Sequence, residues 1–220
     1  MSPPCPAGRS VRAEGTGRRR VGVVPFPSPP WPMRAEAWVS LFAVRAGAGG
    51  RPGGLYGAAF FDYQQGSVLS YHELLVARLV RDGRTPRVRI SDIWVDSEES
   101  LAGGRSLWAI PKDLADLPLR SSGWGVATRT TVSGVAAGQQ LASGTFTTLP
   151  GAALVRAPFS TSLTQERPDG TEVVTPFRGS TRALPCRARW RFDTAGPLAF
   201  LDGRRPLASF HLRDVRLTFG

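Results

Sequence analysis

SEESLAGGRSLWAIPKDLA, at residues 97–115, contains the only lysine of this chain, Lys112. All but one of the 28 lysine and arginine residues in the 220-residue chain are therefore arginines. A coding bias toward GC-rich codons explains much of that ratio. A lysine kept against such a bias indicates a need for its amine, because a guanidinium stays protonated and cannot replace it. The alternative is a chance surface lysine.

Apolar residues precede Lys112. Trp108 and Ile110 crowd it, and Pro111 fixes its own φ and biases Ile110 toward an extended conformation. We therefore expect Lys112 at the end of a buried extended segment. A lysine with the ordinary pKa of about 10.4 is almost wholly protonated at pH 7. Amine chemistry thus requires burial, or a neighbouring cation such as Arg105, to disfavour the charged form.

The pattern GR-x-x-W-x-x-PK at residues 104–112, preceded by Tyr71-x-Glu73, resembles the acetoacetate decarboxylase family. The resemblance extends over roughly residues 30–215. In that family the lysine after the proline forms a Schiff base with a β-keto acid. Glu73 lies 39 positions before Lys112, about the family's spacing between its active-site glutamate and lysine. The resemblance implies that Lys112 and Glu73 are catalytic, and that substrate is bound by Arg34, Tyr71, Arg105, Trp108 and Ile110.

Three features depart from the family pattern. Asp113 stands where the decarboxylase has a second lysine, and a carboxylate facing Lys112 would favour the protonated amine. Consecutive residues of an extended segment point to opposite faces, so Asp113 can face away. Ala109 and Ile110 replace a glycine and an aromatic residue, and the arginine that holds the substrate carboxylate has only Arg34 as a weak counterpart. Schiff-base chemistry is therefore better supported than decarboxylation itself.

Glu73 has two interpretations. Alternation along a strand predicted at residues 67–80 puts Tyr71 and Glu73 on one face and His72 on the other. As a structural residue, Glu73 would accept a bond from an arginine or a backbone amide. As a functional residue, it would orient the amine of Lys112 or transfer protons during imine formation and hydrolysis. Tyr71 is expected to be core or pocket wall rather than an acid.

The composition is typical of a globular protein, with 41% hydrophobic and 20% charged residues. No run of eighteen apolar residues is present, so we predict no membrane span. Two cysteines and two histidines form no ligand cluster, and imine chemistry needs no cofactor. We therefore expect a cytoplasmic protein that uses neither a metal nor a cofactor.

The formal net charge of +11 is concentrated in part near the N-terminus. Residues 1–30 are rich in Pro, Gly, Ser and Arg without apolar periodicity, which predicts a disordered tail before a domain at residues 31–220. The tail is either an arm that touches nucleic acid or an upstream stretch included by a misassigned start codon. The apolar run at 21–26 is too short for a signal peptide. Nucleic-acid binding ranks last among our hypotheses.

Strand patterns dominate the rest of the chain. Before the lysine segment, aromatic and β-branched runs predict strands at 37–44, 55–63, 67–80 and 86–95, with a hairpin turn at Asp82-Gly83. Residues 96–99 predict the start of a short helix that Gly103 and Gly104 end almost at once. Further strands are predicted at 125–132, 140–148, 154–161, 172–175, 188–192 and 207–219, with hairpin turns at Asp169-Gly170 and Asp202-Gly203.

Short, regularly spaced strands indicate a mostly β sandwich or barrel. The resemblance narrows this to an open, conical antiparallel β-barrel or double sheet with one or two short helices. The leading functional hypothesis is a lyase that decarboxylates a β-keto acid through an imine on Lys112. The alternatives are an imine-based aldolase, dehydratase or hydrolase acting on a larger carbonyl compound, and a non-catalytic small-molecule-binding protein of the same fold. The resemblance also implies a homo-oligomer.

Overall fold

The computed structural model describes residues 24–124, 127–149 and 155–220. Residues 1–23 of the predicted disordered tail therefore lie outside the described residues. Residues 24–30 are in contact with the domain. Phe26 packs on its core, and the Pro27 carbonyl accepts a 3.0 Å hydrogen bond from Trp31 Nε1.

Strands make up most of the described residues, with one α-helix and two short 3-10 turns. The elements are β1 (Trp31–Val44), η1 (Ala48–Gly50), β2 (Gly54–Tyr63), β3 (Tyr71–Asp82), β4 (Thr85–Val95), α1 (Glu98–Trp108), β5 (Lys112–Leu114), β6 (Leu119–Trp124), β7 (Ala127–Ala136), β8 (Gln139–Thr148), β9 (Ala157–Glu166), β10 (Glu172–Phe192), η2 (Ala199–Leu201) and β11 (Ala208–Phe219). The mostly β fold with a short helix was predicted correctly.

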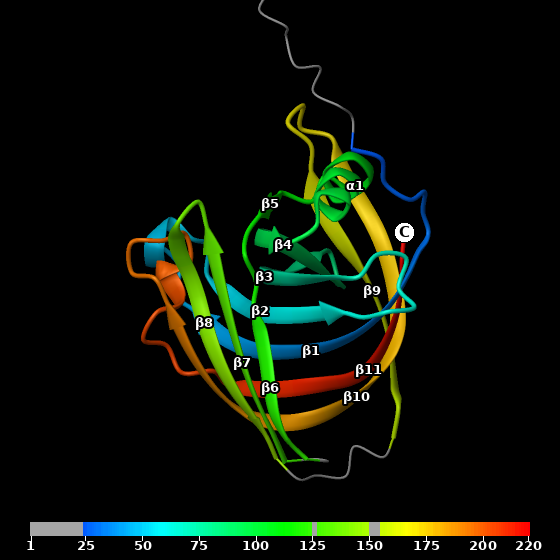
Figure 1. The fold of residues 1–220 in the computed structure, drawn as a ribbon. Coiled ribbons are helices and arrows are strands. Elements are labelled where there is room, and N and C mark those ends of the chain that lie inside the picture. The colour runs from blue at the N-terminus through cyan, green and yellow to red at the C-terminus, as the bar shows by residue number, and fades with distance from the viewer. Residues whose placement is uncertain (1–23, 125–126, 150–154) are drawn as a thin grey trace, which may run out of the picture.

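Seven strands form a ring in the order β11-β1-β2-β3-β4-β9-β10, which closes because β10 also pairs with β11. The remaining long strands, β8, β7 and β6, continue from the second half of β10 as a separate group beside the ring (Figure 1). Pairing is antiparallel except for β4 with β5 and β4 with β9. The antiparallel architecture expected from the resemblance is therefore present, with two short parallel contacts at β4.

Strand β10 differs most from the sequence prediction. One strand of 21 residues spans both predicted segments, 172–175 and 188–192. Its first half pairs with β9 and β11, and Cys186–Phe192 pairs with β8, so β10 belongs to the ring and to the second group of strands. Pro176 and Pro185 obscured this continuity, because proline inside a run normally argues against a central strand.

Two of the predicted turns are confirmed and one is not. Asp82 ends β3 at a tight turn into β4, and Asp169-Gly170 lies in the turn between β9 and β10. Asp202-Gly203 instead follows η2 in the long connection from β10 to β11. Strand β3 begins at Tyr71, four residues after the predicted start at residue 67. Ser67 instead lies in a turn, where its hydroxyl group forms hydrogen bonds with the backbone amide and carbonyl of Arg34.

Strands β2 and β3 bury residues on both faces along residues 56–63 and 71–77, where they pair with each other. Phe60 on β2 and Leu74 on β3 pack with Phe146 of β8 in one hydrophobic cluster. Tyr63 and Tyr71, which occupy odd-numbered positions, belong to a second cluster inside the ring. The alternation of these strands therefore directs one set of side chains into the interior of the ring.

No helix in the described part of the chain is long and apolar enough to cross a lipid bilayer.

His72 lies on the face of β3 opposite Glu73 and joins this strand to the start of α1. Its backbone amide donates to Asp96 Oδ1 at 2.6 Å, and its ring Nδ1 lies 2.8 Å from Asp96 Oδ2. The hydrogen bond to Asp96 raises the pKa of His72 above 6.5, with Asp62 adding a weaker attraction. The pair therefore stabilises the fold fully below about pH 6.5, and this contribution is lost as the pH rises through the raised pKa.

We expect wild type to be more stable than His72→Gln by less than about 1 kcal/mol at pH 5.5 to 6, because the pair is partly exposed to solvent. The difference should shrink as the pH approaches about 8.5. Urea unfolding of both proteins across this range measures it. A stability difference that stays constant with pH would contradict the assignment to the charged pair.

Candidate active site

Lys112 reaches the interior of the ring from the segment that follows α1. The helix begins at the N-cap Ser97 and ends at Ala109, which adopts a left-handed conformation with φ of 54°. Pro111 follows, and Lys112 then starts β5, opposite Ile93 of β4. Lys112 is only 3% exposed. The predicted burial is therefore observed, but Lys112 begins an extended segment instead of ending one.

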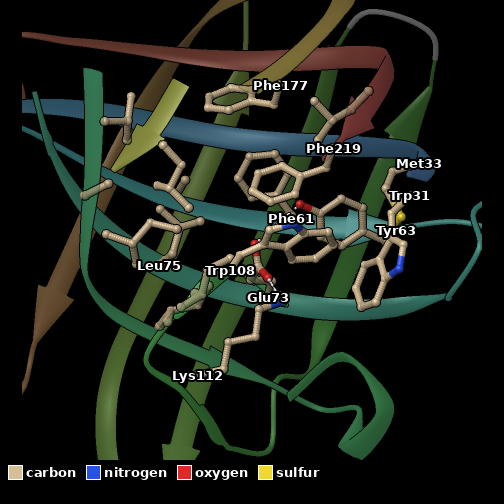
Figure 2. A pocket seen from close by; sticks show the side chains of 18 of the residues that line it. Trp31, Met33, Phe61, Tyr63, Glu73, Leu75, Trp108, Lys112, Phe177 and Phe219 are labelled. Atoms are coloured by element: carbon tan, nitrogen blue, oxygen red, sulfur yellow. Dashed lines mark hydrogen bonds and ion pairs between the residues drawn. The ribbon is translucent and has the colours of Figure 1, made fainter. Parts of the chain in front are cut away.

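Three oxygen atoms surround the amine of Lys112. Nζ lies 2.8 Å from Ser100 Oγ, 2.9 Å from Glu73 Oε2 and 3.3 Å from the Tyr71 hydroxyl. Figure 2 shows Lys112 and Glu73 pointing toward each other from opposite sides of the site. Glu73 is 4% exposed, so both members of the pair are removed from water. The functional interpretation of Glu73 fits this geometry.

Two tyrosines fix the carboxylate of Glu73. The Tyr63 hydroxyl donates to Oε1 at 3.3 Å, and the Tyr71 hydroxyl donates to Oε2 at 3.4 Å. Burial, followed by the negative charge of Glu73, raises the pKa of both phenols well above 10. Both tyrosines therefore stay neutral and act as hydrogen-bond donors to Glu73 at any pH near neutrality.

This network allows a proton to move between Lys112 and Glu73 without movement of heavy atoms. A 2.9 Å hydrogen bond already joins Nζ to Oε2. A carboxylate at this distance from the amine is within reach to accept its proton. The arrangement can thus present a nucleophilic amine and hold the proton that this amine gives up.

Gly103 and Gly104 do not end the helix as predicted. Helix α1 continues through both residues to Trp108. A Cβ atom at Gly104 would lie 2.8 Å from Cδ and Cε of Lys112, and one at Gly103 would lie 2.6 Å from the Trp31 ring. These glycines are therefore required for close packing of the helix against the lysine and the ring, rather than for a helix stop.

We expect Gly103→Ala to destabilise the protein by about 1–3 kcal/mol through overpacking against Trp31. In an unobstructed helix the same change stabilises by about 1 kcal/mol, so the sign is diagnostic. Chemical unfolding compares this variant with Ser106→Ala, at an exposed position of the same helix, which should be neutral or slightly stabilising. Stabilisation by Gly103→Ala would contradict the packing argument.

An apolar cavity of about 250 Å³ lies beside the Lys112 network. Glu73, Lys112 and two tyrosines supply its polar groups, and the other lining residues are apolar. Several large side chains close its walls, as Figure 2 shows: Trp31, Met33, Phe61, Trp108, Phe177 and Phe219. Trp108 and Ile110, which the resemblance predicted to bind substrate, both line this cavity and are 6% and 4% exposed.

Two arginines predicted to hold a substrate carboxylate lie elsewhere. Arg34 is exposed on β1, between Met33 and Ala35, which are both buried. Arg105 donates from Nε to the Lys112 carbonyl at 2.7 Å and from Nη2 to Asp113 at 2.5 Å. Neither arginine lines the cavity. Their positions correct the prediction that they bind substrate, and Arg105 instead supports the backbone at Lys112.

Asp113 lies on the side of β5 away from the amine of Lys112. Its side chain is 65% exposed and pairs with Arg105. Asp113 therefore points away from the cavity, as alternation along an extended segment allows. The acid next to the lysine in sequence does not face the amine.

Sequence reasoning missed two residues of the network, Ser100 and Tyr63. Ser100 is fully buried and lies three and four residues before Gly103 and Gly104, on the same face of α1. That spacing of small residues is the signal that identifies the helix face packed on the lysine. Tyr63 gives no comparable signal, because only its pairing with Tyr71 across β2 and β3 brings it to Glu73.

Within residues 24–124, 127–149 and 155–220, no three His, Cys, Asp or Glu side chains come together as a metal site requires.

The sequence of this chain matches the model of a known protein family. A family model described as acetoacetate decarboxylase matches residues 51–188, which include Glu73 and Lys112. No curated protein matches the sequence significantly.

Three solved structures resemble the fold. Acetoacetate decarboxylase from Legionella pneumophila matches with a TM-score of 0.62 at 15% identity, over 93% of this chain and 89% of that chain. An acetoacetate decarboxylase-like enzyme from Sphingomonas wittichii RW1 gives 0.62 at 12% identity, over 94% and 96%. The enduracididine biosynthesis enzyme MppR gives 0.60 at 15% identity, over 91% and 88%. Because the family model also covers more than half of the sequence, this chain belongs to the acetoacetate decarboxylase family.

Proposed function

We propose that this protein is an enzyme that forms a Schiff base between Lys112 and a β-keto acid and decarboxylates the bound acid. The observation that carries the proposal is the buried amine of Lys112, 2.9 Å from Glu73 at the edge of an apolar cavity. Membership of the acetoacetate decarboxylase family supports it.

The first stage is formation of the imine. Lys112 transfers a proton to Glu73, and the neutral amine adds to the ketone carbon of the substrate. A proton from nitrogen passes to the former carbonyl oxygen through Glu73, which then protonates the resulting hydroxyl group so that water leaves. The product is an iminium cation beside the Glu73 carboxylate, which stabilises its positive charge.

The iminium then accepts the electrons of the bond that breaks. The bond between the α-carbon and the carboxylate cleaves, its electron pair forms the enamine double bond, and the iminium π electrons return to nitrogen. Carbon dioxide leaves and the enamine is neutral. Two opposite charges disappear in this step, so an apolar cavity favours it over the charged iminium carboxylate.

The last stage consumes one proton from solvent. Glu73 and the hydroxyl of Tyr71 are placed to relay that proton to the enamine carbon, which restores the iminium. Water then adds to the iminium, with Glu73 accepting its proton, and the ketone is released with regeneration of the amine. The lysine itself supplies the electrophile, so these steps use no further cofactor.

Borohydride trapping tests the proposal. The protein is incubated with a panel of β-keto acids and ketones, reduced, and analysed by intact mass and peptide mapping. We expect an adduct on the peptide that contains Lys112, together with carbon dioxide release from the β-keto acids. Only the N-terminal amine competes with Lys112 for labelling, because the chain has one lysine. The absence of any adduct up to about pH 9 would contradict the proposal.

A second reaction of the same imine, an aldol or dehydration reaction, is favoured by one observation. No arginine of the described residues lines the cavity, so a carbonyl substrate without a carboxylate also suits it. Among the similar structures, MppR has been solved with the condensation product of pyruvate and imidazole 4-carboxaldehyde. Adduct formation on Lys112 without carbon dioxide release from any β-keto acid would select this alternative.

A further inference from the structure

The cavity extends well beyond the groups that react. Glu73, Leu75 and Ala77 are successive lining residues on the inner face of β3. At about 3.4 Å per residue, the distance from Glu73 to Ala77 is about 14 Å along the strand. The neighbouring strand β2 lines the same length of the cavity, because its lining residues Phe61 and Gly57 pair with Glu73 and Ala77. The cavity therefore runs along the strands, away from Lys112.

Polarity is confined to one end of this channel. Glu73, Lys112, Tyr63 and Tyr71 lie together, and the lining beyond them is apolar. Among the described residues, no charged side chain other than Glu73 and Lys112 lines the cavity. A substrate therefore meets polar groups only at its carbonyl and carboxylate, and the rest of the molecule meets hydrocarbon.

The far part of the channel is lined by small side chains and remains open. Gly57, Ala59 and Ala77 line it from β2 and β3. A Cβ atom at Gly57 would meet only Leu41 Cδ2, at 3.8 Å, so the space above Gly57 is empty. Lys112 and Glu73 are buried, whereas Gly57 and Val88 in the far part are half-buried. The amine thus lies away from solvent, and the far part of the channel is partly open at these two positions.

The volume of the cavity agrees with an extended ligand. A cavity of about 150 Å³ holds one benzene ring, so about 250 Å³ has room for roughly ten non-hydrogen atoms. Acetoacetate carries only a methyl group on its ketone carbon. It would occupy the end near Lys112 and leave the apolar walls along β2, β3 and β4 in contact with water.

We propose that the substrate carries a medium-length apolar chain or an aromatic ring on the carbon bound by Lys112, and that this group lies along the channel toward Gly57 and Ala77. The assignment rests on the proposed imine chemistry and specifies its substrate class. Recognition comes from burial of the apolar group, and no guanidinium clamp on the carboxylate is required.

A chain-length series tests this assignment. kcat/KM is measured for β-keto acids from acetoacetate to β-keto decanoate, with carbon dioxide release corrected for spontaneous decarboxylation, and for an aryl β-keto acid. We expect kcat/KM to rise about two- to fourfold for each added methylene, the gain that burial of a methylene provides, until the chain fills the channel. Borohydride trapping with the matching methyl ketones should follow the same order.

Gly57→Leu provides the structural test. Its backbone lies outside the left-handed region and the space above it is open, so the leucine side chain is expected to enter the channel without a clash. The ratio of kcat/KM for β-keto octanoate to that for acetoacetate should fall at least about tenfold, and Gly57→Ala should give a smaller fall. Leu207→Phe, at a residue 65% exposed and outside the cavity, is the control and should leave the ratio unchanged.

The outcomes separate the two proposals. Efficient turnover of acetoacetate with no gain from longer or aromatic groups would overturn the substrate class and leave the imine intact. An unchanged ratio in a folded Gly57→Leu variant would also overturn it. Failure of every compound, short or long, to form an adduct would overturn the proposed function, and the substrate class with it.

Discussion

Replacement of Lys112 by arginine is expected to lower kcat/KM by at least about 10⁴-fold, a loss of the size seen when an enzyme loses its nucleophile. Arginine keeps the positive charge beside Glu73 but cannot lose its proton to become a nucleophile. It is also bulkier, and the lysine side chain already packs closely on Gly104, so some loss of stability is expected in addition. Borohydride treatment with a ketone should leave the peptide that contains position 112 unlabelled in the variant.

A surface lysine provides the matched control for this experiment. Arg81 is exposed near the end of β3, and Arg81→Lys in the Lys112→Arg background restores one lysine outside the cavity. An amine in water stays protonated and should give no adduct under the same conditions. Labelling of residue 81, or unchanged labelling of the protein after loss of Lys112, would show that trapping reports exposed amines and would contradict the assignment. Thermal melts of both variants confirm that they are folded.

The sequence predicted the pairing of Lys112 with Glu73 better than it predicted the walls of the cavity. Lys112 and Glu73 were identified from a motif and from alternation along one strand, and both signals are local. The extent of α1 was predicted wrongly, because Gly103 and Gly104 were interpreted by their low helix propensity. Tertiary packing decides their role, since only glycine lets the helix approach Trp31 and Lys112.

The rest of the cavity depends on pairings between distant strands. Leu163, Phe177 and Phe219 come from β9, β10 and β11, and they reach the cavity because the ring closes through β4–β9 and β10–β11. The sequence pattern predicted two separate strands in place of β10, and it did not predict which residues of β9, β10 and β11 pair with one another. The positions of Arg34 and Arg105 could not be predicted for a related reason: a residue's face depends on pairing, and Arg34 follows an inward-facing Met33.

Glu73→Gln is expected to lower kcat by about 10²–10⁴-fold, the usual contribution of a positioned acid or base. Glutamine keeps the shape of the side chain, and its carbonyl oxygen can still accept from Tyr63 or Tyr71. It cannot accept the proton of Lys112 or return a proton to the departing hydroxyl. Removal of the carboxylate also leaves a buried ammonium without a counterion, which favours the neutral amine.

The two effects of Glu73→Gln oppose each other, because a neutral amine favours attack on the ketone whereas loss of the carboxylate slows every proton transfer. Trapping after a long incubation and turnover should therefore separate. We expect the variant to form a borohydride-reducible adduct on Lys112 while carbon dioxide release becomes slow. Glu166→Gln makes the same chemical change at an exposed carboxylate outside the cavity, and its kcat should match wild type. If Glu73 only positioned Lys112, adduct formation and turnover would fall together in the variant. Retained adduct formation over a long incubation with slow turnover therefore identifies Glu73 as the group that transfers protons. An imine that forms slowly without Glu73 still accumulates for trapping, whereas each turnover needs those proton transfers at the catalytic rate.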